Sequence, residues 1–221
     1  MKITENPQHD PLTEIPIVDA YFCWGMMAAE ELIGKPGLHS VLRDAGLERL
    51  IDQRPSDDLI ISGNYTVGDY TNYLVGLQEF FGRASKSMML RIGKLSSKYA
   101  IEQQGSLYGV AALLGSKLLP VSTQIKLVLE NVQSGFRKLY EPHGITFQMS
   151  VEDRGETWAY IVKECPFCAG KHSDEPMCHS WVGSIGESVH WMTGNHFQVV
   201  ETECRAMGGS ACVWEVGKKP V

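Results

Sequence analysis

Cysteines in the last quarter of the chain are the residues best suited to chemistry. Five of the six cysteines lie between positions 165 and 212. Thiolates are soft ligands that suit tetrahedral Zn²⁺. In a chain that begins without a signal peptide, such a cluster indicates a metal site rather than disulfides. The sixth, Cys23, stands alone among aromatic residues, and we expect it to be buried as a small apolar side chain.

Two sets of four ligands compete for this metal. The first consists of Cys178, Glu201, Cys204 and Cys212. The second consists of the knuckle Cys165-Pro166-Phe167-Cys168 together with Cys178 and His179. The CxxC knuckle chelates well because both sulfurs of one tight turn point toward one centre. Spacing alone does not choose between the sets, and a mixed set of Cys165, Cys168, Cys204 and Cys212 also stays open. With four protein ligands the site is closed, so the metal holds the fold rather than activating water.

The bulk composition is that of an ordinary globular protein. Of the 221 residues, 43% are apolar and 21% charged, which allows a large core. The net charge of -6 offers no basic face for nucleic acid. No stretch approaches the roughly 18 apolar residues of a membrane span, and the N-terminus lacks the apolar core of a signal peptide. We therefore expect a cytoplasmic protein that binds neither nucleic acid nor membranes.

The first 140 residues are predicted to be mainly helical. Residues 1–16 hold three prolines and are expected to form a loose lead-in. Helices are expected at 18–33, 37–51, 67–81, 84–103, 106–117 and 121–140. Gly34 and Pro36 stop the first helix. Thr66 caps the third, with Asp69 completing a capping box.

The hydrophobic period then changes to the alternation of strands. Strands are expected at 145–151, 158–162, 197–204 and 211–216, with a short helix at 180–193. The last two strands surround a Gly-Gly turn and form a hairpin that places Cys204 and Cys212 across from one another. Helices followed by an antiparallel sheet predict an α+β fold.

The motif between Cys178 and Trp214 resembles the C-terminal half of the 4-vinyl reductase domain family. Its residues are Cys178, Gly183, Glu201, Cys204, Gly208, Cys212 and Trp214. The four ligands are separated by 23, 3 and 8 residues, as in the family's phenol-sensing members. The family includes sensor domains of phenol-responsive transcription regulators and a bacteriochlorophyll-biosynthesis protein, and is distantly similar in fold to TRAPP vesicle-tethering subunits. The resemblance spans about 65–217 in outline but only 178–214 by motif.

This resemblance implies both a ligand set and a domain division. It favours zinc at Cys178, Glu201, Cys204 and Cys212. The pair Cys165 and Cys168 lies outside that set and is left as a second metal site, a redox pair or alternative ligands. We expect an antiparallel sheet flanked by helices, of the TRAPP and NO-signalling ligand-binding type, at 65–221. Residues 1–64 are then a lead-in and helical extension.

The resemblance also implies an apolar pocket between the sheet and its flanking helices. The predicted wall residues are Phe147, Met149, Trp158, Tyr160, Phe136 and Val132. Each of them equally fits an ordinary core, because a half-buried sheet alternates in the same way. Phenol sensors use a histidine and a tryptophan, and Trp158 lies near the position of that tryptophan. The 121–140 helix has no matching histidine, so phenol itself is not predicted.

The function predicted from these features is that of a binding module. A zinc-stabilised domain captures a small hydrophobic or aromatic molecule as a sensor or carrier, forms a homodimer, and signals through a separate partner. Residues 18–52 are the expected surface for either contact. One alternative is an accessory or carrier protein for a chlorophyll-type tetrapyrrole intermediate. A zinc-dependent enzyme is another, although no catalytic acid–base pair is evident and we expect no enzymatic activity.

Overall fold

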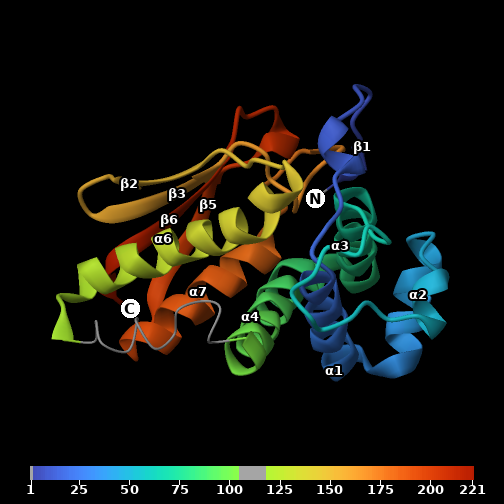
Figure 1. Ribbon diagram of the computed structural model, residues 1–221, viewed down its shortest axis with the longest axis horizontal. Coiled ribbons are helices and arrows are strands. Elements are labelled where there is room, and N and C mark those ends of the chain that lie inside the picture. The colour runs from blue at the N-terminus through green and yellow to red at the C-terminus, as the bar shows by residue number, and fades with distance from the viewer. Residues whose placement is uncertain (1, 105–117) are drawn as a thin grey trace.

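The computed structural model describes residues 2–104 and 118–221. Its helices are α1 (Asp19–Asp44), α2 (Arg49–Asp52), α3 (Val67–Phe81), α4 (Ser85–Gln104), α6 (Val121–Tyr140) and α7 (His179–Thr193). Its strands are β1 (Ile3–Glu5), β2 (Met149–Asp153), β3 (Thr157–Val162), β4 (Lys171–Ser173), β5 (Phe197–Glu203) and β6 (Cys212–Pro220). An antiparallel sheet in the order β2-β3-β6-β5 packs against α6 and α7, and α1, α3 and α4 extend the molecule beyond them (Figure 1). The predicted α+β fold with an antiparallel sheet flanked by helices is confirmed.

The helices begin and break close to the residues that the sequence signals predict. Gly34 adopts φ 68° and ψ 167°, which is not helical, so α1 consists of two helical segments that meet at a kink there, as the predicted stop at Gly34 requires. Both hydrogen bonds of the capping box between Thr66 and Asp69 are formed at the start of α3. Helix α6 spans the predicted range 121–140, directly after Pro120. The helix expected at 106–117 lies outside the described residues.

The strand expected at 145–151 forms its ladder only from Met149 onward. Met149 pairs with Val162, the last residue of β3, so the chain before Met149 has no strand partner in that sheet. Phe147 is nevertheless buried, as the alternating pattern predicts. Strand β3 pairs in turn with β6, ending at the pair Val162 and Cys212. This register brings the start of β6 to the edge where β3 leaves the sheet.

The lead-in is not loose, and that prediction is wrong. Strand β1 pairs with β4, which lies between the predicted strand at 158–162 and the predicted helix at 180–193. Asp10 accepts a hydrogen bond from the backbone of Gly170 at 3.0 Å and forms an ion pair with Arg205 at 3.2 Å. These contacts fasten the N-terminus to the segments that carry the cysteines. Local sequence patterns do not reveal such pairing, since the partners are about 170 residues apart.

Helices α4 and α7 cross so closely that glycine is required at the contact. A Cβ atom at Gly93 would lie 1.8 Å from the carbonyl oxygen of Ser180. One at Gly183 would lie 2.1 Å from the carbonyl oxygen of Leu90. The crossing joins the two halves of the molecule, and the hydrophobic core runs without interruption across the expected boundary between 64 and 65.

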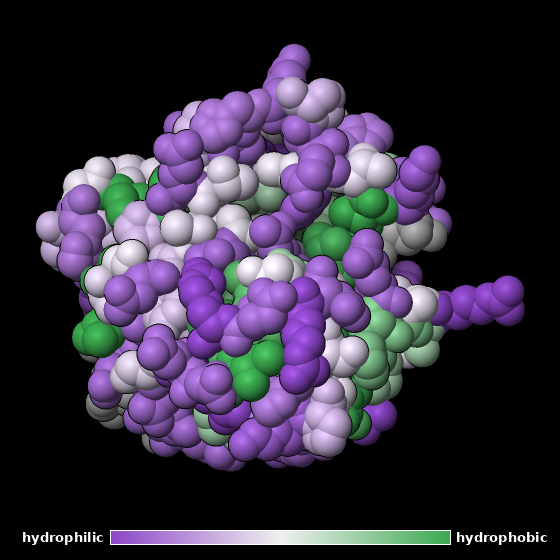
Figure 2. Space-filling view, turned by 90° about the vertical axis from the view of Figure 1, so that its right-hand side faces the viewer, coloured by the Kyte–Doolittle hydropathy of each residue, from purple (hydrophilic) through white to green (hydrophobic). Residues whose placement is uncertain are grey.

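The surface shows no extended apolar area on the face drawn in Figure 2, which is mostly hydrophilic with separate hydrophobic patches. Large exposed apolar side chains such as Ile60 and Phe80 are about half exposed, as scattered surface residues often are. Within the described ranges, no helix has the length and apolar character needed to cross a bilayer.

Candidate functional site

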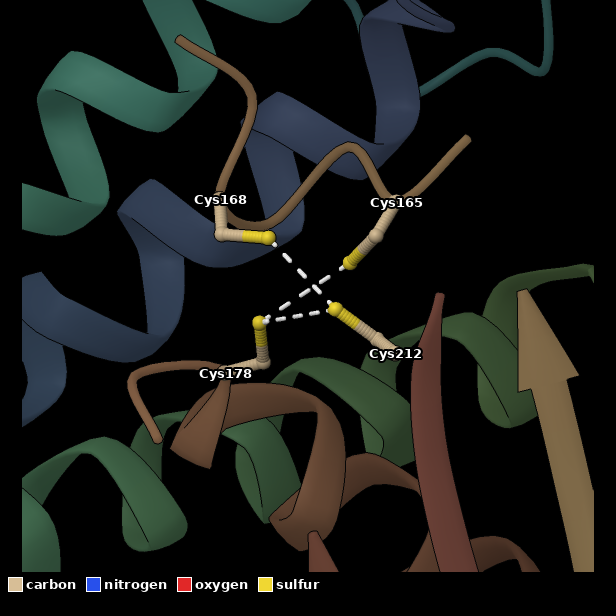
Figure 3. Close-up of side chains that lie close together, drawn as sticks. All are labelled: Cys165, Cys168, Cys178 and Cys212. Carbon is tan, nitrogen blue, oxygen red and sulfur yellow. Dashed lines mark hydrogen bonds between the residues drawn. The ribbon is translucent and has the colours of Figure 1, made fainter. Parts of the chain in front are cut away.

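Six side chains that offer metal ligands converge where β3, β6 and α7 meet. They are Cys165, Cys168, Cys178, Glu201, Cys204 and Cys212. The Cys165–Cys168 loop follows β3, Cys178 precedes the first turn of α7, and Cys212 begins β6. In Figure 3 the sulfurs of the loop, the helix and the strand point toward one another. All of these cysteines are free thiols and buried.

The donors form two overlapping groups of four, and within each group all donor atoms lie within 4.8 Å of one another. One group is Cys165, Cys168, Cys178 and Cys212, and the other is Cys178, Glu201, Cys204 and Cys212. The Sγ–Sγ distances are 3.8 Å for Cys165 and Cys178, 3.5 Å for Cys168 and Cys212, and 4.0 Å for Cys178 and Cys212. A tetrahedral ion with metal–sulfur bonds of about 2.3 Å places its sulfurs about 3.8 Å apart. The sulfurs are therefore spaced as ligands of a tetrahedral ion.

Glu201 supplies an acceptor that the protein itself does not satisfy. Its Oε2 accepts a hydrogen bond from the backbone N–H of Cys178 at 2.9 Å, but Oε1 has no partner among the described residues. The side chain is only 7% exposed. Burial raises the pKa of Glu201 to about 7. A buried acceptor without a partner calls for an explanation, and a cation at this point supplies one.

The clustered thiols are buried and close to one another, and burial opposes the ionisation of Cys165 and Cys178. Burial raises the pKa of Cys165 to about 12 and that of Cys178 well above its ordinary value. The pKa of Cys168 is lowered instead, chiefly by its hydrogen bond with the Cys165 thiol. A divalent ion displaces the shared protons because metal ligation requires thiolates. The six donors therefore have the chemistry and spacing of metal ligands.

The structure brings together every ligand of the first predicted set. The second set is assembled differently from the prediction, since Cys212 completes it and His179 belongs to neither group. His179 is buried at the start of α7, and its desolvation, with Lys86 nearby, lowers its pKa. Cys23 lies apart in α1, with its sulfur 3.9 Å from that of Met27. The predicted sets already shared Cys178, and the mixed set joined the knuckle to Cys212, but no predicted set combined the knuckle with both Cys178 and Cys212.

A cavity of about 130 Å³ lies beside this centre, between α1, α4, α6, α7 and the Cys165–Cys168 loop. Aromatic rings make up much of its wall: Tyr21, Trp24, Phe136, Phe167, Trp181 and Trp191. Hydroxyl groups on the wall are mostly engaged with the protein. The Ser97 and Ser188 hydroxyls lie 2.9 Å apart, and Ser184 donates to the carbonyl oxygen of Gly93. The cavity therefore offers an apolar environment with few free polar groups.

The metal centre and the cavity share a wall. Pro166 and Phe167, the two residues between the knuckle cysteines, line the cavity. The Phe167 ring stacks on Trp181 with centroids 4.7 Å apart and an interplanar angle of 27°. Trp181 in turn follows the ligand Cys178 by three residues. The cysteine cluster and the cavity are thus adjacent at Phe167 and Trp181.

Two of the six predicted wall residues, Phe136 and Val132, do line the cavity. The other four pack between the sheet and α6. The indole of Trp158 donates to the carbonyl of Ser122, Tyr160 donates to the sulfur of Met149, and Phe147 packs edge-on against Tyr140. The cavity lies toward α1 and α4 instead. Sequence reasoning missed this side, although Gly93 and Gly183 within helical segments were a signal of close helix contact.

Comparison with known families supports the resemblance drawn from the ligand spacing. Residues 158–218 match the family model of the 4-vinyl reductase domain, which confirms that assignment for this part of the chain. The match covers β3, the knuckle, α7 and the closing hairpin, and therefore every candidate metal ligand. No curated protein matches the chain significantly.

Solved structures similar to the whole chain are H-NOX proteins. One is the Fe(II) unliganded H-NOX protein from K. algicida, with a TM-score of 0.60, 12% identity, and coverage of 93% of this chain and 98% of that one. Another is an oxygen-binding H-NOX domain related to soluble guanylate cyclases, with a TM-score of 0.59, 12% identity, and coverage of 93% and 97%. A third, from S. oneidensis in the Fe(II)NO state, has a TM-score of 0.58, 10% identity, and coverage of 90% and 98%. At these identities the likeness concerns the fold.

The residues of this chain do not fit a heme of the kind named in a study of heme distortion in the H-NOX family. Among residues 2–104 and 118–221, the cavity wall includes no histidine, cysteine or methionine, which are common axial ligands of heme iron. Tyrosine also serves as an axial ligand, but the Tyr140 hydroxyl already accepts a hydrogen bond from the Val18 N–H, and burial raises the pKa of Tyr70. The cavity of about 130 Å³ is also below the roughly 300–1,000 Å³ typical of larger ligands. The chain therefore carries a 4-vinyl reductase domain at residues 158–218, set within a fold like that of H-NOX proteins.

Proposed function

We propose that this protein is a zinc-stabilised binding domain that captures a small aromatic molecule, as a sensor or carrier. The observation that carries the proposal is the wall shared by the sulfur-rich centre and the aromatic cavity, at Phe167 and Trp181. A metal bound to Cys178 fixes the first turn of α7, which carries Trp181, and Phe167 stacks on that indole. The cavity then keeps a defined shape for its ligand.

The size of the cavity favours a ligand of about one ring. An engineered apolar cavity of about 150 Å³ in another protein binds benzene, and this one measures about 130 Å³. Aromatic walls favour offset or edge-on packing with a planar ligand. Toluene and phenol are therefore suitable probes. The same volume speaks against a carrier role for a tetrapyrrole.

One residue of the cavity wall carries a buried polar atom without a hydrogen-bond partner among the described residues. The indole Nε1 of Trp181 is buried and has no hydrogen-bond partner within the described part of the chain. Trp181 lines the cavity. A ligand with a single acceptor oxygen satisfies this donor, whereas a hydrocarbon leaves it unpaired. The ligand class is therefore a single aromatic ring, with preference for one oxygen substituent.

Zinc is proposed from the chemistry of the donors. Three thiolates and one carboxylate at tetrahedral spacing suit Zn²⁺ and leave no open position for water. When bound, the ion would supply a fixed cross-link between the start of α7 and the hairpin. This supports a structural role over a zinc enzyme. Dimerisation through residues 18–52, a separate signalling partner and a cytoplasmic location stay predictions.

Filling the cavity tests the proposal. Ala100 lines the cavity on α4, so Ala100→Phe should weaken toluene binding by at least about tenfold. Lys98→Phe adds the same ring on the exposed side of the same helix and should bind toluene like the wild type. Binding is measured by calorimetry or by the ligand-induced rise in melting temperature. Equal toluene affinity in both variants would overturn the proposal, as would stoichiometric uptake of hemin with a Soret band.

A further inference from the structure

We propose that the centre holds two metal ions, bridged by the thiolates of Cys178 and Cys212. The proposal rests on the zinc site of the proposed function and adds a second ion, bound by Cys165 and Cys168. It assigns a role to the CxxC knuckle, which the three-cysteine, one-glutamate pattern does not use. The centre is then two tetrahedra that share one edge.

The overlap of the two donor groups is the first observation behind this. Both groups contain Cys178 and Cys212, and each group adds two donors of its own. Two tetrahedral sites that share an edge require this arrangement of two common ligands and two terminal ligands per ion. The terminal ligands come from separate segments, the knuckle on one side and the β5–β6 hairpin on the other.

Either assignment of a single ion leaves buried donors unexplained. If the ion binds the knuckle group, the Oε1 atom of Glu201 stays without a partner in a side chain that is only 7% exposed. If the ion binds the Glu201 group, it does not account for the short sulfur distances of the knuckle. The Sγ atom of Cys165 lies 3.8 Å from that of Cys178, and the Sγ atom of Cys168 lies 3.5 Å from that of Cys212. Those distances are the edges of a tetrahedral site. Two ions engage all six donors.

Charge favours two ions as well. The six donors carry six negative charges when all are ionised, so one divalent ion leaves four uncompensated and two ions leave two. Uncompensated buried charge is strongly unfavourable. One fixed cation, Arg205, interacts electrostatically with Cys168, Cys165 and Cys212, but it is also paired with Asp10, so its single charge does not compensate the cluster. Its backbone N–H donates to the Cys212 sulfur at 3.3 Å. A second ion is the direct way to ionise the whole cluster.

The geometry requires only a small adjustment. With metal–sulfur bonds of about 2.3 Å, ions about 3 Å apart need bridging sulfurs about 3.5 Å apart. The Sγ atoms of Cys178 and Cys212 lie 4.0 Å apart. Binding of the second ion should draw them together by about half an ångström.

The second ion has a direct consequence for the cavity. It binds Cys165 and Cys168, and so it holds Pro166 and Phe167 against Trp181 from the knuckle side. The ion in the Glu201 group joins the hairpin to Cys178 but does not bind the knuckle. The knuckle ion is therefore the one that shapes the ligand wall.

Cobalt titration of the metal-free wild-type protein tests the count and the bridge together. Two equivalents of Co²⁺ should bind, each adding thiolate-to-cobalt absorption and tetrahedral bands. The second equivalent should diminish the electron paramagnetic resonance signal of the first, because bridging thiolates couple the two spins. Saturation at one equivalent, or two ions with independent signals, would overturn the proposal. Iron with acid-labile sulfide in protein as purified would overturn it too.

Serine variants locate the ions, with zinc counted by native mass spectrometry. Wild type should retain two ions, and Cys168→Ser and Cys204→Ser should each retain one. Cys212→Ser, which removes a bridge, should lose both. One zinc per wild-type chain refutes the second ion while leaving zinc-stabilised toluene binding intact. The two proposals can therefore be refuted independently of each other. The cobalt titration uses only the wild-type protein, so its result does not depend on whether a variant folds.

Discussion

At the scale of single residues, two tryptophans differ in what their indole N–H groups contact. The indole of Trp158 donates to the backbone carbonyl of Ser122, and its ring lies outside the cavity wall. The indole of Trp181 has no partner among the residues that the structure describes, and its ring lines the cavity. Of these two tryptophans, only Trp181 therefore combines a place in the cavity wall with an indole N–H that has no partner among the described residues.

Replacing Trp181 by phenylalanine keeps a ring and removes the donor. We expect Trp181→Phe to weaken phenol binding about tenfold while changing toluene binding little, because only phenol offers an oxygen to the indole. Calorimetric titration of both ligands measures the difference. Trp158→Phe is the matched control and should leave the ratio of the two affinities unchanged. An unchanged ratio in Trp181→Phe would contradict the assignment.

Because of Glu201, we expect the stability of the metal-free protein and that of the metal-bound protein to change with pH in opposite directions. In the metal-free protein its pKa is raised from 4.5 to about 7, so its contribution to stability is full below pH 4.5 and is lost as the pH rises through 7. Metal binding requires the carboxylate and thiolates, so metal affinity rises with pH. Melting temperatures from pH 5 to 8 should therefore fall for metal-free protein, relative to Glu201→Gln, and rise for loaded protein. Parallel curves for the two wild-type forms would refute this.

At the scale of elements, the crossing of α4 and α7 determines how the cavity is formed. Gly93 and Gly183 let the two backbones touch, which places Ser97 and Ser188 within hydrogen-bond distance. The crossing also carries the first turn of α7, and with it Cys178, into contact with the core beside α4. Metal site and cavity therefore depend on one helix contact.

A methyl group at this contact should separate the helices. Gly183→Ala places a Cβ 2.1 Å from the carbonyl oxygen of Leu90, so we expect destabilisation of about 3 kcal/mol and weaker toluene binding. Gly186→Ala lies one turn further along, with its nearest neighbour 3.9 Å away. It should be neutral or stabilise α7 by up to about 1 kcal/mol. Urea unfolding measures both, and equal stabilities would show that the crossing is looser than described.

Sequence reasoning succeeded where the signal was local. The Thr66–Asp69 capping box and the break at Gly34 follow from neighbouring residues, and the structure has both. The cysteine–glutamate spacing found the hairpin ligands because β5 and β6 are adjacent in the chain. The β1–β4 pair and the role of Cys212 in the knuckle group depend on contacts between distant segments. The cavity was misplaced because periodicity shows that a helix face is apolar but not which neighbour it meets.

At the scale of the whole molecule, distant parts of the chain meet at the metal centre. The N-terminal segment reaches it through the ion pair of Asp10 with Arg205 and through β1 on β4. Helix α1 contributes Tyr21 and Trp24 to the cavity on the opposite side. The centre therefore lies between the chain's N-terminal segment and its ligand cavity, which is a suitable arrangement for coupling ligand binding to a change elsewhere.

Toluene affinity with and without metal tests this coupling most directly. Structural zinc contributes on the order of 10 kcal/mol of apparent binding free energy, so its removal should release the knuckle and loosen the wall at Phe167. We expect chelation to weaken toluene binding at least about tenfold, and added Zn²⁺ to restore it, in calorimetric titrations of one wild-type preparation. Circular dichroism on the same samples reports how much of the fold is retained. Equal affinity in the metal-free and zinc-loaded protein would contradict the account.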